Sequence, residues 1–360
     1  MKNKISRDKL AIWFMKNEPE KYKDMCESNH TVNMFEPNMF HAENWTWSHT
    51  LLVMTWVECQ KDKYTDQDYI VLITSALLHD TGKPNCQETM PANETKPIRN
   101  SFKGHEGVST FFAIGVLKKL QTEFPEIYND GIIEKIIKVV SLHGTYIDET
   151  SDIYFLRDEF RKADKNGAIR LVDEGLYSQY EKRKFLKESA KDSDKNLIVL
   201  IGLPNSGKST KRIKLQEKIT DLKVVSRDDL LEEFYYKRMG KIDDYNTMYR
   251  FVHEDGTILK QFKAEFEYLL NTLAKIEKNI LIDMTQLSLS SRRKMLNHFP
   301  KFNKKAIVIM TDNDELYRRN DQRFLETKKF ISTKVIENMM TSFTYPVLEE
   351  GFDSIELIIN

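Results

Sequence analysis

The stretch from residue 197 to residue 210 constrains this chain more than any other part of its sequence. The apolar run 197–201 has the pattern of a buried β-strand and leads directly into Gly-Leu-Pro-Asn-Ser-Gly-Lys-Ser at 202–209. A polar, helix-compatible stretch follows from residue 211. Glycines in this context let several backbone N–H groups converge on one anion at a helix N-terminus. The sequence therefore predicts a phosphate-binding loop and disfavours a plain glycine-rich turn.

The residues of this loop are expected to bind a nucleotide and its metal. Lys208 is predicted to reach the β- and γ-phosphates of ATP or another NTP, and the Ser209 hydroxyl to hold Mg²⁺. The other positions predicted to bind the nucleotide are Gly202, Asn205, Ser206, Gly207 and Thr210.

The second half of the chain alternates strand-like and helix-like segments. Short β-rich runs lie at 197–201, 222–226, 280–283, 306–311 and 355–359. Alternation of this kind predicts an α/β domain with a parallel sheet. A polar, charge-rich stretch at 177–195 precedes these runs, so we place a domain boundary there and predict domains at 1–192 and 193–360.

The first half is predicted to be all-helical. Apolar residues recur at three- and four-residue spacing over 51–59, 69–78, 108–120 and 132–142, and no convincing strand pattern is present. Six of the eight histidines lie in the first 150 residues, which indicates that the two halves carry different chemistry.

The composition limits the class of protein. Lys plus Arg equals Asp plus Glu, at 55 each, so a polyanion must be bound by local basic groups rather than by net charge. Three cysteines indicate neither a disulfide framework nor a cysteine zinc site. No apolar run approaches the roughly 20 residues that span a bilayer, so we expect a cytoplasmic protein without a membrane partner.

Carboxylates follow two of the predicted strands. Asp228 and Asp229 follow the run 222–226 after Arg227, and Asp283 ends the run 280–283. At the carboxyl edge of a parallel sheet, Asp228 fits a general base that deprotonates an attacking hydroxyl, while an N-cap is the alternative and is favoured for Asp229. Asp283 could hold Mg²⁺ through water or be a structural residue.

Three arginines follow the run 306–311 in a helical stretch. Arg319 and Arg323 are four residues apart and share a helix face, whereas Arg318 does not. Two guanidiniums on one face suit a lid that closes on a triphosphate, and a solvated helix face is the alternative.

In the first half, an apolar helix ends in His79-Asp80-Thr-Gly-Lys83. Adjacent imidazole and carboxylate groups at a helix end could converge on one cation, with His49 and Asp164 as further ligands from other helices. A bound metal activates water near neutral pH and polarises a phosphoryl oxygen, which are the two needs of phosphoester hydrolysis.

Over most of residues 196–360 the motifs resemble the 5′-hydroxyl polynucleotide kinases of end-healing enzymes. The resemblance implies that Asp228 is the general base, that Lys208 and Ser209 serve ATP and Mg²⁺, and that Arg323 is the lid arginine. That family often has an arginine three residues after the base, where this chain has Leu231; Arg238 or Lys237 could substitute.

Over roughly residues 30–180 the chain resembles the HD phosphohydrolase superfamily. The resemblance implies a helical fold in which His49, His79, Asp80 and Asp164 bind a divalent transition metal. It also implies that His105 and His143 bind a second metal or the substrate phosphate, and that Lys83 neutralises phosphate. His41 is left open between the site and a surface loop, and His30 is expected at the surface.

Together the halves resemble the bifunctional HD-Pnk end-healing enzymes. The expected activities are removal of a 2′,3′-cyclic, 2′- or 3′-phosphate and phosphorylation of a 5′-hydroxyl at RNA or DNA ends, before a separate ligase seals them. A homodimer remains compatible with the sequence. The alternatives are a nucleoside or nucleotide kinase fused to a nucleotidase acting on metabolites, and a non-catalytic nucleotide sensor.

Overall fold

A computed structural model of the chain describes residues 5–32, 38, 41–92, 98–145, 147–169, 191, 194–327, 329 and 331–360. These residues form two compact units, one with residues 5–169 and Met340–Tyr345, the other with residues 191–339 and Pro346–Asn360. The boundary predicted between residues 192 and 193 lies outside the described residues and stays a prediction, as does most of the polar stretch 177–195.

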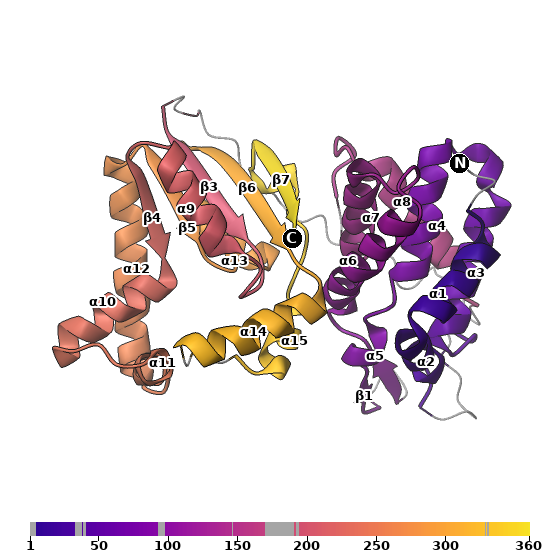
Figure 1. Ribbon diagram of the computed structural model, residues 1–360, viewed down its shortest axis with the longest axis horizontal. Helices are drawn as coiled ribbons and strands as arrows, with labels where there is room; N and C mark the ends of the chain where they lie inside the picture. Colours follow the sequence, from indigo (N-terminus) through magenta and orange to yellow (C-terminus); the bar gives the residue numbers. More distant parts are fainter. Residues whose placement is uncertain are drawn as a thin grey trace. The chain divides into compact units, whose positions relative to one another are not determined.

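The first unit is built mainly from helices, as predicted (Figure 1). They are α1 (Arg7–Asn17), α2 (Pro19–Glu27), α3 (Thr46–Cys59), α4 (Asp66–Leu78), α5 (Lys83–Cys86), α6 (His105–Glu123), α7 (Asp130–Leu142) and α8 (Tyr154–Gly167), with a 3₁₀ turn η1 (Lys61–Lys63). The expectation of no strand is wrong, because β1 (Glu88–Met90) pairs antiparallel with β2 (Arg99–Ser101). Strands of three residues are too short to show an alternating pattern.

Helix α4 is the centre of the first unit. Every side chain from Tyr69 to Leu78 is buried, and α4 packs against α3, α7 and α8. A helix that is apolar on all sides must be surrounded by others. Thr65 caps its N-terminus by accepting a hydrogen bond from the backbone N–H of Asp68. The helix ends at Leu78, so His79 and Asp80 lie at the end of the most buried element.

The second unit contains a parallel sheet of five strands in the order β4-β5-β3-β6-β7. The strands are β3 (Asn196–Ile201), β4 (Leu222–Ser226), β5 (Asn279–Asp283), β6 (Asn303–Met310) and β7 (Ser354–Ile359). The helices are α9 (Lys208–Lys218), α10 (Arg227–Met239), α11 (Tyr245–His253), α12 (Gly256–Ile276), α13 (Leu289–Leu296), α14 (Asn313–Thr327) and α15 (Thr333–Met340), with a 3₁₀ turn η3 (Leu348–Glu350). The predicted fold class is confirmed, and each predicted β-run forms a strand.

The register of the sheet brings the functional loops together. Leu200 of β3 pairs with Asp283 at the end of β5, and Asp283 pairs with Ser226 at the end of β4. The phosphate-binding loop follows β3, so it lies beside the carboxyl ends of β4 and β5. Among the described residues, none of the helices combines the length and the apolar character needed to cross a bilayer.

Candidate active sites

The first candidate site gathers histidine and aspartate side chains from five helices of the helical unit. His49 lies in α3, Asp164 in α8 and His105 at the start of α6, while the remaining members follow the ends of α4 and α7. All of the residues that the sequence predicted as ligands come together here: His49, His79, Asp80, His105, His143 and Asp164.

Two groups of ligand atoms lie side by side in this site. His49 Nε2 is 2.9 Å from Asp164 Oδ1, and His79 Nε2 is 3.7 Å from the same oxygen. In the other group, His105 Nε2 is 3.2 Å from His143 Nε2. Asp80 joins the two groups, because its Oδ2 is 3.1 Å from His79 Nε2 while its Oδ1 is 3.3 Å from His105 Nε2. This arrangement fits two adjacent cations that share Asp80.

Three of these histidines are oriented by their own backbone. Nδ1 of His79, His105 and His143 lies 2.9, 2.8 and 2.6 Å from the carbonyl oxygen three residues earlier. A carbonyl oxygen only accepts, so Nδ1–H donates and each Nε2 presents a lone pair to the site. Metal-binding histidines are typically held in this way.

Burial and charge also suit the donor set to a metal. His79 Nε2 is buried and makes no hydrogen bond of acceptable geometry with any described residue. Burial lowers the pKa of His143 to about 4, so its imidazole is neutral near pH 7. For His49, burial is outweighed by the carboxylates of Asp164 and Glu43, which raise the pKa to about 9, so a metal that binds there displaces a proton. Burial opposes ionisation of Asp80, but the neighbouring His79 and Lys83 side chains hold the pKa of its carboxyl well below the usual range. Neutral imidazoles and ionised carboxylates are the forms that bind divalent cations.

Lys83 and Gly82 complete this corner of the site. Lys83 Nζ lies 2.7 Å from Asp80 Oδ2 and its side chain is buried, which places its charge where a phosphate oxygen could bind. A Cβ on Gly82 would lie 2.6 Å from the His105 carbonyl oxygen and from the Ser109 nitrogen. Only glycine permits this approach of α6, which carries His105 towards Asp80.

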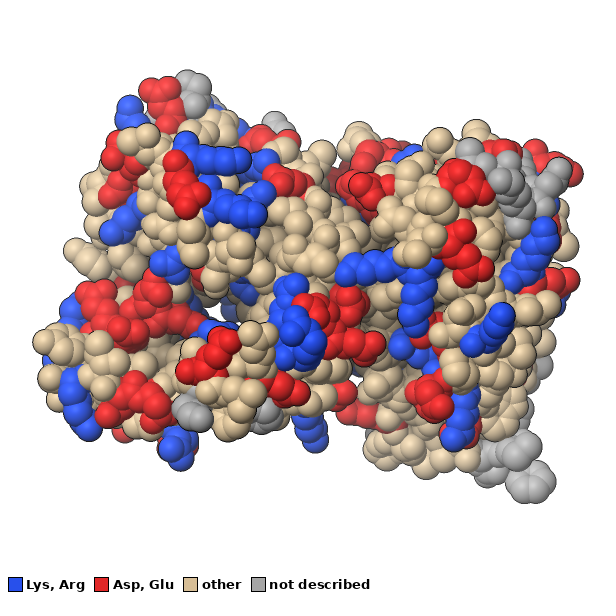
Figure 2. All heavy atoms as spheres, viewed as in Figure 1, with Lys and Arg blue, Asp and Glu red and all other residues tan. Residues whose placement is uncertain are grey.

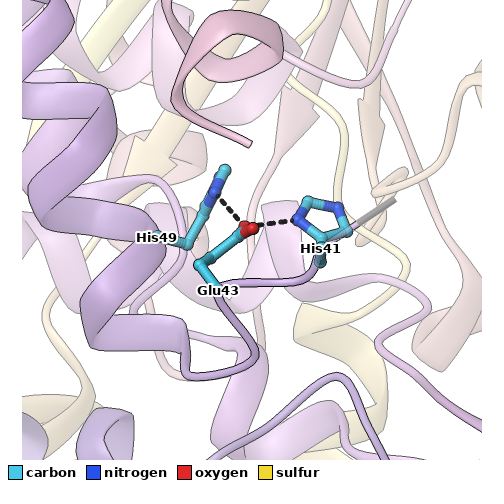
Figure 3. Close-up of side chains that lie close together, drawn as sticks. All are labelled: His41, Glu43 and His49. Carbon is cyan, nitrogen blue, oxygen red and sulfur yellow. Dashed lines mark hydrogen bonds and ion pairs between the residues drawn. The ribbon is translucent and has the colours of Figure 1, made fainter. Parts of the chain in front are cut away.

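Behind His49 lies a carboxylate that sequence reasoning missed. Glu43 Oε1 is 2.8 Å from Nδ1 of both His41 and His49, as Figure 3 shows. Glu43 is therefore an ion-pair partner of His49, although His49 Nδ1 and Glu43 lack the hydrogen-bond geometry that backbone carbonyls give the other three histidines. The expectation that His30 is a surface residue is wrong: it is 4% exposed, its ring stacks on His41 at 4.1 Å, and its Nε2 faces Lys83 Nζ at 3.3 Å.

The second candidate site is a cavity of about 1110 Å³ around the phosphate-binding loop. Asn205, Gly207, Lys208, Ser209 and Thr210 line it, with positive φ angles of 66° at Asn205 and 102° at Gly207 that turn the loop. The other two predicted loop positions support it. A Cβ on Gly202 would lie 2.4 Å from the Ile309 carbonyl oxygen, and the Ser206 carbonyl accepts from Asn360 Nδ2 at 2.6 Å.

The loop lysine is held by the loop itself. Lys208 Nζ donates to the carbonyl oxygens of Gly202 and Leu203 at 2.9 and 2.7 Å. Burial lowers the pKa of Lys208 to about 8, and the nearby carboxylates of Asp283 and Asp228 oppose this shift. A half-buried ammonium beside loop carbonyls gains more suitable partners when phosphate oxygens arrive.

Two aspartates face the same cavity. Asp228 lies in the first turn of α10, with Oδ1 3.1 Å from the Tyr245 hydroxyl and Oδ2 2.6 Å from Lys329 Nζ. Asp283 lies at the end of β5, and burial raises the pKa of its carboxyl. The alternative role of Asp228 or Asp229 as N-cap is wrong, because Ser226 caps α10 by accepting from the Asp229 N–H.

The two arginines predicted to share a helix face both contact the phosphate-binding loop. Arg319 donates to the carbonyl oxygen of Asn205 and Arg323 to the side-chain oxygen of Asn205, both at 3.2 Å. Arg318 does not line the cavity and pairs with Glu315, which also accepts a hydrogen bond from Arg319. Both paired arginines line the cavity, so they can reach a nucleotide phosphate with little movement.

The kinase family often has an arginine three residues after the base, but this chain has Leu231 there, and other groups lie near Asp228. Leu231 is buried at the cavity wall, and neither Lys237 nor Arg238 lines the cavity, since Lys237 pairs with Glu233 and Arg238 with Glu265. Lys329, which sequence reasoning missed, lies against Asp228 instead. On the face drawn in Figure 2, basic and acidic side chains are intermixed, so local groups of this kind must provide any grip on a polyanion.

Comparisons with known protein families agree with the two units. The HD domain family matches residues 46–199, and the AAA domain family matches residues 197–346. The chain therefore combines an HD domain with an AAA-type P-loop domain. This is the domain combination of the HD-Pnk type that the sequence motifs resemble.

Solved structures give more distant likenesses. A chain of the Pnkp1/Rnl/Hen1 RNA repair complex is 24% identical over 42% of this chain, with a TM-score of 0.35. The match spans less than half of that chain, 45%. Kti12 from Chaetomium thermophilum, solved with ADP-AlF3, is 15% identical over 45% of this chain and 88% of its own, with a TM-score of 0.32. A gluconokinase from Sinorhizobium meliloti 1021 is 15% identical over 46% of this chain and 83% of its own, with a TM-score of 0.30. None of these likenesses assigns a substrate.

Proposed function

We propose that this protein heals broken nucleic-acid strands. Its HD unit would act as a metal-dependent phosphoesterase on 2′,3′-cyclic, 2′- or 3′-phosphate ends, and its P-loop unit as an ATP-dependent kinase of 5′-hydroxyl ends. Cleavage of RNA by transesterification leaves both kinds of end on one break, and a ligase accepts neither. A separate ligase would then seal the healed ends.

The observation that carries the proposal is a carboxylate in the same cavity as the phosphate-binding loop. A nucleotide sensor needs the loop, whereas a kinase also needs a base for the acceptor. Asp228 meets this need, since it lies in the first turn of a helix at the edge of the sheet and lines the cavity with Lys208. The acceptor hydroxyl would lose its proton to Asp228 as its oxygen bonds to the γ-phosphorus and the bond to the ADP oxygen breaks.

The cations of the P-loop unit would stabilise the charge that moves during transfer. Lys208 would bind the β- and γ-phosphate oxygens, and Arg323 and Arg319 would bind the transferring phosphoryl from the α14 side. Mg²⁺ would be held by Ser209, with Asp283 nearby, and would neutralise phosphate charge. All five of these side chains line the same cavity: Lys208, Ser209, Asp283, Arg319 and Arg323.

In the HD unit, His49, His79, Asp80 and Asp164 would hold one divalent metal, and Asp80, His105 and His143 a second metal or the substrate phosphate. The metal would supply Lewis-acid activation of water and of the phosphoryl oxygen. Lys83 would pair with a phosphate oxygen, because its ammonium already lies beside the Asp80 carboxylate. Glu43 would keep His49 in the tautomer that leaves Nε2 free to bind.

The test reads both ends of one substrate. A short RNA with a 5′-hydroxyl and a 2′,3′-cyclic phosphate is incubated with the protein, ATP, Mg²⁺ and a transition metal, and is weighed by mass spectrometry. We expect one phosphoryl group to be gained at the 5′ end and the cyclic end to be converted to hydroxyls. Unchanged RNA, with ATP consumed only when nucleosides are added, would instead support a metabolite kinase.

A further inference from the structure

Helix α11 presents a row of three rings to the cavity of the P-loop unit. Tyr245, Tyr249 and His253 follow at four-residue spacing, so they share one face of the helix. The centroids of Tyr245 and Tyr249 are 6.1 Å apart with the planes at 28°, and those of Tyr249 and His253 are 3.8 Å apart with the planes at 10°. All three rings line the cavity that also contains the phosphate-binding loop.

The opposite face of α11 is anchored, which fixes the direction of this row. Met248 and Val252 are buried in an apolar cluster with Phe234 of α10 and Phe262 of α12. Asp244 caps the helix by accepting from the N–H groups of residues 246 and 247. Tyr249 nevertheless remains 45% exposed, so its aromatic surface is not there to complete the core.

The row begins at the candidate base and runs along cationic groups. The Tyr245 hydroxyl lies 3.1 Å from Asp228 Oδ1, and Lys329 Nζ lies 3.3 Å from the centre of the Tyr245 ring. At the other end, Arg227 approaches His253 Nε2 at 3.4 Å. Aromatic rings with interleaved cations are the combination with which proteins bind single-stranded nucleic acid.

We propose that Tyr245, Tyr249 and His253 form the platform on which the terminal bases of a single-stranded polynucleotide acceptor stack. Arg227 and Lys329 face its phosphodiesters, and the 5′-hydroxyl lies at Asp228. The inference rests on the proposed kinase function and names how its acceptor is held. It also explains how the chain can have Leu231 where the kinase family often has an arginine. In this proposal the acceptor is bound by the rings of α11 and the cations beside them, not by an arginine of α10.

The dimensions of the row favour a strand over a single nucleoside. Eight residues of α-helix span about 12 Å, whereas stacked nucleotides follow each other at about 3.4 Å, so the platform extends beyond one base. A base inserted between Tyr245 and Tyr249 needs two such spacings, about 6.8 Å. The 6.1 Å between the two centroids is slightly less, so the two rings must separate by about 0.7 Å for a base to enter.

The experiment measures binding rather than turnover. The protein, without ATP, is titrated into a single-stranded RNA hexamer that has 5′- and 3′-hydroxyl ends and a fluorophore on the base of its 3′-terminal nucleotide, and fluorescence anisotropy gives the Kd. The 3′-hydroxyl end offers the HD unit no phosphomonoester or cyclic phosphate. The variants are Tyr249→Ala and Tyr249→Phe. The matched control is Tyr268→Ala, a tyrosine of α12 that is 74% exposed and does not line the cavity.

We expect Tyr249→Ala to weaken binding about tenfold, as loss of one base–aromatic stack does, while Tyr249→Phe and Tyr268→Ala bind like the unaltered protein. A hexamer without its 5′-terminal base should bind the unaltered protein as weakly as the intact hexamer binds Tyr249→Ala, with little further loss when both changes are combined. Equal binding of the intact hexamer by the unaltered protein and Tyr249→Ala would overturn the platform.

A second measurement separates the platform from the kinase proposal. The KM for the 5′-hydroxyl hexamer should rise in Tyr249→Ala while the KM for ATP stays unchanged. If the unaltered protein phosphorylates the hexamer and Tyr249→Ala leaves its KM unchanged, the platform is wrong and the kinase stands. If the binding pattern holds and no 5′-phosphate forms, the kinase proposal is wrong and the platform stands.

Discussion

In the HD unit, the candidate ligands come from the ends and faces of five helices, whereas in the P-loop unit most phosphate-binding groups occupy one continuous loop of eight residues, to which α14 adds Arg319 and Arg323. The helical site is assembled before any ligand arrives, because carbonyl or carboxylate oxygens already hold each histidine. The P-loop cations instead rest on the loop's own oxygens, as Lys208 does on Gly202 and Leu203.

This difference has a chemical consequence. A metal entering the HD unit meets lone pairs already aimed at it, so its affinity depends on the groups that hold the ligands. A nucleotide entering the P-loop unit must exchange contacts with Lys208 and Arg319, so its binding depends on the charges themselves. The substitutions below test this contrast.

The largest effect is expected for Asp80→Ala. Asp80 contacts ligands of both groups in the HD unit, so its loss should lower phosphoesterase activity by about 10⁴-fold and leave 5′ phosphorylation within about twofold. The control is Asp152→Ala, a carboxylate whose side chain is 71% exposed. End-specific assays on one RNA measure both activities. Loss of both activities in Asp80→Ala would contradict separate sites.

Lys208→Ala is the converse change in the P-loop unit. Removal of the loop ammonium should lower the kinase rate by about a thousandfold and spare the phosphoesterase. Lys218→Ala, an exposed position at the end of the same helix, serves as the control. Transfer of labelled γ-phosphate to a 5′-hydroxyl strand measures the effect. A kinase rate within tenfold of the original would remove Lys208 from the mechanism.

Arg323→Ala should have a smaller effect on the same rate. We expect a loss of about a hundredfold in kcat, because Arg319 remains beside Asn205 to bind part of the transferring charge. Arg318→Ala is a close control, since that arginine is on the same helix but is 63% exposed and pairs with Glu315. Equal effects of the two substitutions would favour a solvated helix face over a lid.

The smallest expected effect is that of Glu43→Gln in the HD unit. A neutral amide accepts the His49 N–H more weakly, so metal affinity should fall by about 10- to 100-fold without loss of the fold. Calorimetric titration with Mn²⁺ measures it, and Glu134→Gln, on α7 beside Lys138, is the control. Unchanged affinity would show that His49 needs no support from Glu43.

Most of the P-loop unit could be predicted because its signals are local. Each strand of its sheet is a short apolar run, and a strand, a glycine loop and a helix follow one another along the chain. Burial of the central strands β3, β5 and β6 on both faces leaves this pattern in the sequence, whereas the edge strands β4 and β7 are partly exposed. Asp228 and Asp283 could be predicted because they lie at the ends of such runs.

The missed residues share a different origin. Glu43 and His30 lie in irregular chain before α3, where no periodicity indicates their direction; an isolated pairing of Asn29 with Trp45 brings this segment to the site. Lys329 and Asp228 are in contact although 101 positions separate them in the sequence. Contacts of this kind are fixed by tertiary packing, so only the folded chain reveals them.

The central claim is that one chain carries two independent sites for the two ends of a break. Complementation tests it most directly: Asp80→Ala and Lys208→Ala are mixed with an RNA that has a 5′-hydroxyl and a 2′,3′-cyclic phosphate, and the product mass is measured. The account predicts that the mixture heals both ends, whereas each variant alone heals one. A mixture that leaves either end unhealed, under conditions where the unaltered protein heals both, would contradict it.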